Sequence, residues 1–172
     1  MGEEMLKKLF SKKIETRVVE IYSPLDGEAI PLEEVPDPVF AQKMMGDGLA
    51  IIPKNGKVVS PINGKVVQIF PTKHAVGLVS EEGLEILIHI GLETVELNGE
   101  GFEVEVNVGE TVKVGDLLLN VDLDYLEQKH KEIVTPIVIT NMFDKVGDLE
   151  YVEKNNAVTR GDVIMKCSVK VI

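Results

Sequence analysis

The sequence contains few of the residues that stabilise small secreted proteins. Among its 172 residues there is one cysteine, no tryptophan, and a total of 5% aromatic residues. A single cysteine cannot form an intramolecular disulfide, so a disulfide-stabilised extracellular fold is excluded. The sequence also shows no signal peptide and no apolar run of about 18 residues, which a transporter would need to cross a membrane. We therefore expect a cytoplasmic protein.

Basic residues are also scarce. The 18 Lys and Arg residues are outnumbered by 29 Asp and Glu residues, which gives a formal charge of −11. Proteins that bind the phosphate backbone need a basic face, so nucleic acid is not an expected partner. An acidic surface instead favours encounter with a positively charged protein. With 44% hydrophobic residues, the chain fits one folded domain and not a disordered tail.

The N-terminal residues 1–17 are expected to form a flexible segment outside a single domain at residues 18–172. Within residues 1–13, apolar and basic side chains recur at helical spacing, which leaves two interpretations open. One is weak attachment of a basic amphipathic segment to an anionic membrane surface. The other is a frayed chain terminus with no binding role.

Valine and isoleucine dominate the rest of the chain, in short runs broken by glycine, proline and acidic residues, as is typical of β-strands. We expect about ten strands, at Arg17–Ile21, Gly48–Ile52, Lys57–Val59, Lys65–Phe70, Ala75–Val79, Leu84–Ile90, Phe102–Val108, Leu117–Val121, Val134–Thr140 and Val163–Val171. Short helices are expected at Pro38–Met45 and Leu123–Lys131, the latter capped by Asp122 or Asp124. Because neither helix is long enough to connect parallel strands, the sequence predicts an all-β, antiparallel sandwich or barrel with two short helices.

Two internal repeats indicate a duplicated unit. Ser23-Pro24-Leu25-Asp26-Gly27 returns 37 residues later as Ser60-Pro61-Ile62-Asn63-Gly64, and residues 114–118 are echoed by residues 160–164. Each copy combines turn residues with an apolar strand. Two copies of each predict internal pseudo-symmetry within one domain and not a solenoid.

The chain has three histidines, and they are not equivalent. His130 lies among charged residues of a predicted helix and is expected on the surface. His89 lies in a strand whose alternation places Ile86, Ile88 and Ile90 on one face and Glu85, Leu87 and His89 on the other. If residues 81–83 form a tight hairpin turn, the strand that begins beside His74 pairs with the strand that contains His89. The two imidazoles then approach each other.

Such a pair of imidazoles suits phosphoryl transfer. One neutral imidazole acts as nucleophile, and the other donates a hydrogen bond to the group that the first accepts. His74, Lys73 or backbone amides would hold the charged phosphoryl group, while Leu87 and Phe70 would keep water away. The alternative is that His89 is only a hydrogen-bonded residue of a half-buried sheet.

Several motifs, in order along the chain, carry a family resemblance: Asp47-Gly48-Leu49-Ala50-Ile51, Ser60-Pro61-Ile62-Asn63-Gly64, Thr72-Lys73-His74-Ala75, Ile88-His89-Ile90-Gly91-Leu92-Glu93-Thr94-Val95 and Leu97-Asn98-Gly99-Glu100-Gly101-Phe102. From about Val18 to the C-terminus, the sequence resembles the glucose-family enzyme IIA of the bacterial phosphoenolpyruvate-dependent sugar phosphotransferase system. The resemblance implies a duplicated-hybrid-motif β-sandwich that takes a phosphoryl group from the carrier HPr and passes it to a cysteine of a sugar-specific enzyme IIB. No second reactive-cysteine domain is evident, so we expect IIB and its permease to be separate proteins.

The resemblance also implies residue roles. His89 matches the phosphorylated histidine, His74 its partner histidine, and Thr72 the hydroxyl that orients His74. The partner-binding surface, here called the collar, corresponds to Asp37, Val39, Phe40, Met44, Met45, Phe70, Leu87, Glu93 and Val95. Many family members carry aspartate at the position of Glu93. For Met44 and Met45, packing in the core of a short helix is an alternative interpretation.

Three other functions compete with phosphoryl transfer. A lipoyl or biotinyl carrier would modify Lys166, but that lysine is predicted in mid-strand and not at an exposed hairpin tip. A zinc hydrolase needs three protein ligands, whereas His74 and His89 offer only a partial zinc site, and no cofactor is required. A regulator whose binding depends on phosphorylation of His89 is compatible with phosphotransfer, and further regulatory targets are expected. Cys167 is predicted to be a buried small hydrophobe.

Overall fold

A computed structural model describes residues 15–152 and 156–171 of the chain. The predicted amphipathic segment at residues 1–13 lies outside the described residues. Residues 15–17, expected to belong to the flexible segment, instead begin strand β1 (Glu15–Tyr22). They pair with the end of β14 (Val163–Val171), where Glu15 lies opposite Val171, so the neighbouring strand satisfies their backbone groups.

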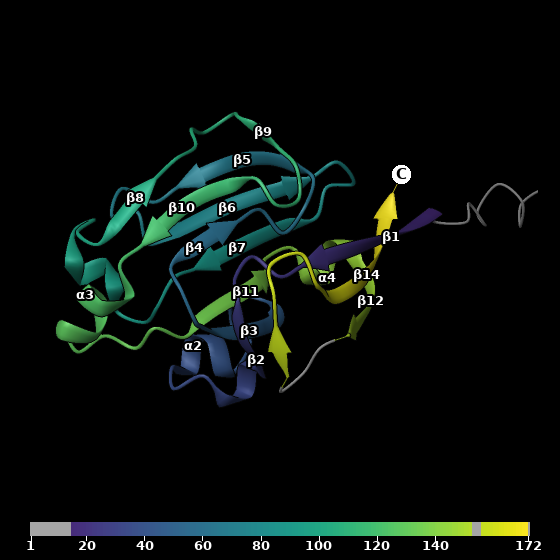
Figure 1. Ribbon diagram of the computed structural model, residues 1–172. Coiled ribbons are helices and arrows are strands. Elements are labelled where there is room, and N and C mark those ends of the chain that lie inside the picture. Colours follow the sequence, from purple (N-terminus) through teal and green to yellow (C-terminus); the bar gives the residue numbers. More distant parts are fainter. Residues whose placement is uncertain (1–14, 153–155, 172) are drawn as a thin grey trace, which may run out of the picture.

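The strands of the described residues form three sheets, whose arrangement Figure 1 shows. The largest has the strand order β13-β2-β3-β11-β7-β6-β5-β9. Its members are β2 (Gly27–Pro31), β3 (Asp47–Pro53), β5 (Gly64–Ile69), β6 (Ala75–Ser80), β7 (Glu85–His89), β9 (Thr111–Val112), β11 (Thr135–Ile139) and β13 (Ala157–Val158). A second sheet joins β4 (Lys57–Val59), β10 (Leu117–Val121) and β8 (Phe102–Val104), and a third joins β1, β14 and β12 (Val146–Tyr151).

All strand pairs in the described part of the chain are antiparallel, which confirms the predicted fold class. One large core cluster takes side chains from all three sheets, among them Ile21, Ile88 and Leu118, each with 0% exposure. The alternation predicted for β7 is also present, since Ile86, Ile88 and Ile90 are buried in this core. The sheets therefore pack around a common interior, as the apolar periodicity predicts.

The two sequence repeats contact each other through matching hydrogen bonds. The backbone amide of Tyr22 donates to Pro61 O (2.9 Å), and that of Val59 donates to Pro24 O (2.9 Å). In each copy the serine hydroxyl donates to the carbonyl two residues later, Ser23 to Leu25 and Ser60 to Ile62, both at 2.7 Å. The predicted pseudo-symmetry is therefore present in the hydrogen bonding.

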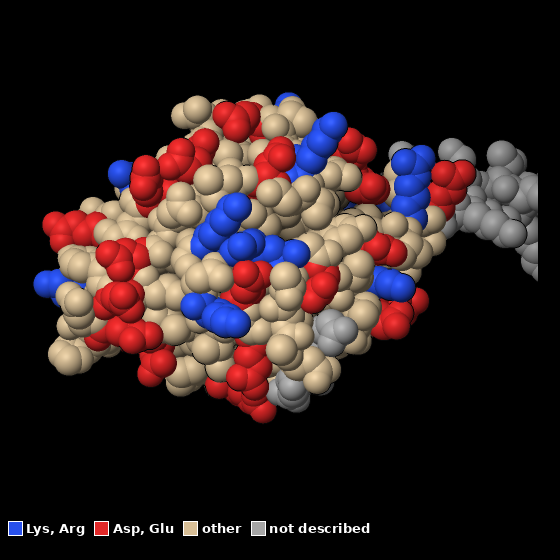
Figure 2. Space-filling model, viewed as in Figure 1, with Lys and Arg blue, Asp and Glu red and all other residues tan. Residues whose placement is uncertain are grey.

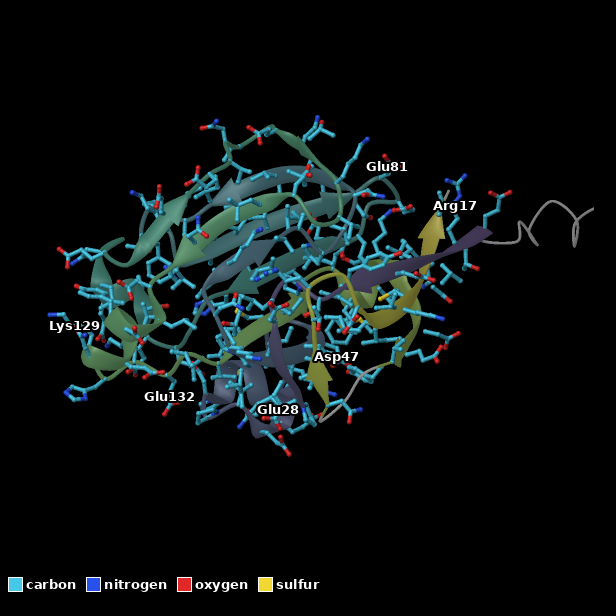
Figure 3. All side chains as sticks on the ribbon, in the orientation of Figure 1. Arg17, Glu28, Asp47, Glu81, Lys129 and Glu132 are labelled. Atoms are coloured by element: carbon cyan, nitrogen blue, oxygen red, sulfur yellow. The ribbon has the colours of Figure 1, made fainter. Side chains whose placement is uncertain are left out.

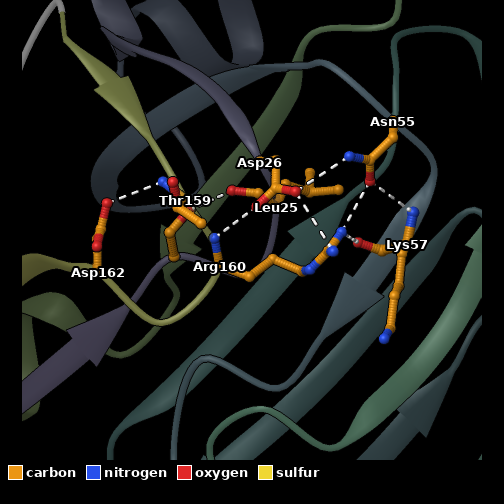
Figure 4. A network of polar contacts seen from close by, with 8 residues as sticks. Leu25, Asp26, Asn55, Lys57, Thr159, Arg160 and Asp162 are labelled. Atoms are coloured by element: carbon orange, nitrogen blue, oxygen red, sulfur yellow. Dashed lines mark hydrogen bonds and ion pairs between the residues drawn. The ribbon is translucent and has the colours of Figure 1, made fainter.

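One position of the repeat carries a charged network in only one copy (Figure 4). Asp26 Oδ1 accepts a hydrogen bond from Arg160 N (2.7 Å), and Asp26 Oδ2 lies 3.3 Å from the Arg160 guanidinium and accepts from Asn55 Nδ2 at 3.1 Å. At the equivalent position of the other copy, Asn63 Oδ1 accepts from Val114 N (2.9 Å). The Asp26 network therefore adds an ion pair to a backbone contact that both copies share.

Both predicted helices are present but shorter. Helix α2 spans Pro38–Ala41, with Asp37 accepting from Val39 N, and α3 spans Leu123–Gln128, with Asp122 accepting from Tyr125 N. After α2 the chain turns at Gly46 to enter β3. A glycine is needed there because a Cβ on residue 46 would collide with the carbonyl oxygen of Ile139. A further short helix, α4 (Met142–Lys145), the short 3-10 segments η1 (Leu32–Glu34) and η2 (Thr94–Leu97), and strands β9, β12 and β13 were not predicted. Strand β2 follows the first copy of the repeat, where a strand was expected without stated bounds.

Within the described ranges, no helix is long and apolar enough to span a membrane. Acidic side chains are spread over the face shown in Figure 2, and basic side chains form a smaller group near its middle. This distribution agrees with the excess of acidic residues in the sequence.

Candidate functional site

His74 and His89 lie side by side at the same end of strands β6 and β7. The two strands pair antiparallel with Ala75 opposite His89, and the connecting turn is closed by Gly83 N donating to Ser80 O (3.0 Å). The imidazole ring centroids are 4.9 Å apart and the rings are nearly perpendicular, at 81°. The predicted hairpin and the approach of the two imidazoles are therefore confirmed.

One nitrogen of His89 is engaged by the backbone and the other is left open. Nδ1 lies 2.8 Å from the carbonyl oxygen of Gly91. A carbonyl oxygen can only accept, so Nδ1 carries the proton and donates it, and Nε2 of the neutral ring keeps its lone pair. Phe40, which is buried, packs its ring 5.0 Å from that of His89. The arrangement presents a neutral imidazole with a nucleophilic Nε2.

Gly91 is required by the geometry of this loop. Its φ is +73°, and a Cβ placed on it would lie 2.7 Å from Thr94 Cγ2 and 2.8 Å from Glu132 O. Thr94 is itself fixed, because its hydroxyl donates to Ile90 O at 2.6 Å. Sequence reasoning missed Gly91, Thr94 and Glu132 as site residues; only the glycine within the motif Ile90-Gly91-Leu92 gave a signal for them.

The side chain of His74 is buried, with 3% exposure, whereas that of His89 is half-buried. Its Nδ1 lies 2.7 Å from Thr72 Oγ1, and its ring meets the ring of Phe70 edge-on, with the centroids 5.3 Å apart. The segment before His74 turns sharply, because Lys73 adopts a positive φ of 62°. The structure thus brings together Thr72, His74 and His89, the three residues expected to take part in the chemistry.

Both imidazoles are held neutral near pH 7. Burial, and secondarily the neighbouring His89, lower the pKa of His74 to about 4. Burial also lowers the pKa of His89, opposed by the hydrogen bond to Gly91 and by the Asp37 carboxylate. A neutral His89 is the form that can attack an electrophile, so the environment favours the nucleophilic state.

Two cavities that share Met45 lie at this end of the sheet, and His89 lines one of them. One, of about 260 Å³, is lined by Asp37, Val39, Phe40, Met45, His89, Glu93, Thr94 and Val95. The other, of about 240 Å³, includes Met45, Phe70 and Leu87 in its wall. Eight of the nine collar residues therefore line one cavity or the other. The ninth, Met44, lines neither of them and is 68% exposed.

The collar combines a mainly apolar surface with a few carboxylates. Val39, Met45 and Val95 are between 37% and 51% exposed, whereas Phe40 and Leu87 are buried beneath them. Because Met44 and Met45 are exposed, the alternative that they pack in the core is wrong. An exposed apolar patch with an acidic edge is typical of a protein-binding surface.

The alternative sites are less well supported by the geometry. Across residues 15–152 and 156–171, no group of three or more His, Cys, Asp or Glu residues could hold a metal ion. Lys166 lies in mid-strand β14, between Glu20 and Glu150 of its two neighbours, and not at a hairpin tip. Cys167 is buried, as predicted, and burial raises the pKa of its thiol to about 12, which keeps it unreactive. His130 is exposed, as expected.

Comparison with known proteins agrees with this site. Residues 19–145 match the family model of the phosphoenolpyruvate-dependent sugar phosphotransferase system, EIIA 1. The chain is 53% identical to a PTS system glucose-specific EIIA component of Staphylococcus epidermidis, over 92% of this chain and 95% of that protein. A component of the same name from Staphylococcus aureus is 51% identical over the same shares.

The fold of this chain is similar to that of a solved structure. The glucose permease IIA from Mycoplasma capricolum superposes with a TM-score of 0.79 at 41% identity, covering 87% of this chain and 96% of that one. The family match extends over most of the present chain, and the histidine pair lies inside it. The chain therefore belongs to the EIIA 1 family of the phosphoenolpyruvate-dependent sugar phosphotransferase system, in which it is a phosphoryl carrier and a phosphotransferase component.

Proposed function

We propose that His89 is the residue that carries the phosphoryl group. The observation that supports this most directly is the hydrogen bond from its Nδ1 to Gly91 O, at 2.8 Å, which leaves Nε2 unprotonated on a residue that lines a cavity. Nε2 attacks the phosphorus of a donor, an N–P bond forms, and the bond from phosphorus to the donor's leaving group breaks. Because Nε2 already has a free lone pair, His89 gives up no proton in this step.

His74 is assigned the role of stabilising the phosphoryl oxygens. Its ring lies 4.9 Å from that of His89, centroid to centroid, and Thr72 Oγ1 lies beside its Nδ1. If the Thr72 hydroxyl donates to Nδ1, the proton of the neutral His74 ring is on Nε2 and is available to the phosphoryl group. Thr72 is then an orienting residue, and His74 is a hydrogen-bond donor to the developing negative charge.

We infer that the donor is phospho-HPr, that the acceptor is the cysteine of a sugar-specific IIB, and that the exchange takes place in the cytoplasm. The apolar collar and its carboxylates, Asp37 and Glu93, suit a partner with an apolar centre and a basic rim. Glucose is the sugar we propose, since the relatives from both Staphylococcus species are glucose-specific components.

A regulatory role and a metal site are secondary proposals. A phosphoryl group brings about −1.5 to −2 charges, so a partner that buries the collar should discriminate against the phosphorylated form. Zinc could bind between His74 and His89 only if another molecule supplied further ligands, because no third His, Cys, Asp or Glu of the described chain joins them. Phosphoryl transfer does not need the metal.

The proposal for His89 is tested by incubating the chain with phosphoenolpyruvate, enzyme I and HPr. Wild type and His130→Ala, which changes an exposed histidine, should each gain one acid-labile phosphate by mass spectrometry. His89→Ala should gain none. A phosphate on His89→Ala would move the acceptor to another residue, and no gain on wild type would overturn the proposal.

A further inference from the structure

The segment that follows helix α3 lies directly behind the loop that fixes His89. The backbone amide of Leu92 donates to Glu132 O at 3.0 Å. The same carbonyl limits the space at Gly91, together with Leu126 Cδ2, which would lie 3.5 Å from a Cβ there. Gly91 supplies the carbonyl that engages His89 Nδ1. The loop that carries Gly91 therefore packs against Leu126 and Glu132.

Lys131 connects this segment to the other end of the same loop. Its Nζ donates to Glu96 Oε2, and Glu96 belongs to η2. The Lys131 side chain is only 12% exposed, so its stem is packed against the protein while its charge meets Glu96 near the surface. Glu93 and Val95, which lie three residues and one residue before Glu96, line the cavity at His89. The Lys131–Glu96 ion pair thus restrains the segment that forms part of the wall of this cavity.

The position of Lys131 is itself well determined. Leu126 of α3 is fully buried, and its carbonyl accepts a hydrogen bond from Lys131 N at 2.9 Å. Between them, His130 adopts a left-handed conformation with φ +59°, the geometry that commonly ends a helix. Because Leu126 packs this turn into the core, the position of Lys131 is fixed, and its ion pair with Glu96 can restrain η2.

We propose that Lys131 is a positioning residue for the phosphoryl acceptor. Through Glu96 it holds η2, and η2 together with the Leu92–Glu132 contact keeps the Gly91 carbonyl opposite Nδ1 of His89. Lys131 acts on the tautomer and orientation of the imidazole through this loop and is not itself a catalytic residue. The inference rests on the proposed role of His89 as acceptor.

The test compares Lys131→Met with Lys129→Met in the full-length chain. Both variants remove one lysine charge from the same turn, but Lys129 is exposed and lies at the outer edge of the molecule, over the Tyr125 ring (Figure 3). At subsaturating phospho-HPr, Lys131→Met should be phosphorylated about fivefold more slowly, whereas Lys129→Met should match wild type. Lys131→Arg, which keeps the charge, should recover most of the rate.

A spectroscopic measurement separates positioning from a general loss of stability. The ¹⁵N shifts of the His89 ring report which nitrogen carries the proton. In Lys131→Met, and also in the surface variant Glu96→Gln, they should move toward a mixture of tautomers. Unchanged ring shifts in both variants would overturn the inference, whatever happens to their stability. Failure of wild type to accept phosphate would instead overturn the role of His89, and the ring shifts would still decide whether Lys131 positions it.

Discussion

Thr72 and His74 are two residues apart, and Oγ1 of Thr72 lies 2.7 Å from Nδ1 of His74. The positive φ of Lys73 between them turns the chain so that both side chains meet. A hydroxyl at this distance orients the buried imidazole and, if it donates to Nδ1, leaves the ring proton on Nε2. The contact between Thr72 and His74 should therefore affect transfer of the phosphoryl group from this chain to IIB.

Thr72→Val removes the hydroxyl with little change in shape. Because a hydrogen bond of this kind contributes about 1–1.5 kcal/mol, phosphoryl transfer to IIB should slow about tenfold. Thr72→Ser keeps the hydroxyl and should stay within about twofold of wild type. Single-turnover transfer from the phosphorylated chain to IIB measures both. Equal rates for Thr72→Val and wild type would remove the orienting role of Thr72.

His74→Gln should separate acceptance from delivery of the phosphoryl group. The nucleophile His89 remains, so the variant should still be phosphorylated by phospho-HPr. Delivery to IIB should fall about a hundredfold, because the donor to the charged oxygens is displaced. The two half-reactions are followed separately by mass spectrometry. Complete loss of acceptance, as expected for His89→Ala, would show that the two histidines do not divide the work in this way.

Gly91→Ala should disturb both the fold and the acceptor. The left-handed φ of +73° and the contacts at 2.7 and 2.8 Å together should lower the free energy of unfolding by about 2–4 kcal/mol. Gly115→Ala is the matched control, since Gly115 also has a positive φ, of 92°, but meets nothing within 4 Å. It should cost only about 1–2 kcal/mol. Urea denaturation gives both values, and similar costs would show that packing at Gly91 is unimportant.

The low pKa of His74 predicts a loss of stability in acid. Above pH 6.5 this imidazole is neutral in both the folded and the unfolded chain and makes no difference to stability. As the pH falls from 6.5 to about 4, the unfolded chain binds a proton that folded His74 refuses, so the free energy of unfolding decreases. Denaturation at several pH values should show a smaller decrease for His74→Gln. The same decrease in both proteins would contradict the lowered pKa.

The Asp26 network should contribute to stability without affecting the chemistry. Asp26→Ala removes the ion pair with Arg160 and two hydrogen bonds, and it should cost about 1–3 kcal/mol. Asp26→Asn should cost less, because Asn63 makes the equivalent backbone contact to Val114 in the other repeat. Urea denaturation distinguishes the two variants. A loss of phosphoryl acceptance by folded Asp26→Asn would show that the network also influences the site.

Much of the site was predictable because its main features are local. The alternation around His89, the turn residues at 81–83 and the position of His74 placed both imidazoles on paired strands. The internal repeat likewise predicted the pseudo-symmetry that the matching hydrogen bonds of Pro24 and Pro61 show. Short strands such as β9 and β13 were missed, because two residues give no detectable periodicity and the neighbouring strands decide their pairing.

The sequence by itself determined the class of fold, the acidic character of the surface and the pairing of the two histidines, since these follow from periodicity, composition and turn chemistry. Only the tertiary structure decided that Met45 joins two cavities while Met44 lies outside both. It alone revealed that Glu132 and Lys131, about 40 residues from His89 in the chain, back the loop that fixes its tautomer. Such contacts depend on how segments far apart in the sequence pack together. The residues around a side chain in the sequence therefore do not predict which distant backbone carbonyl will lie next to it in the folded protein.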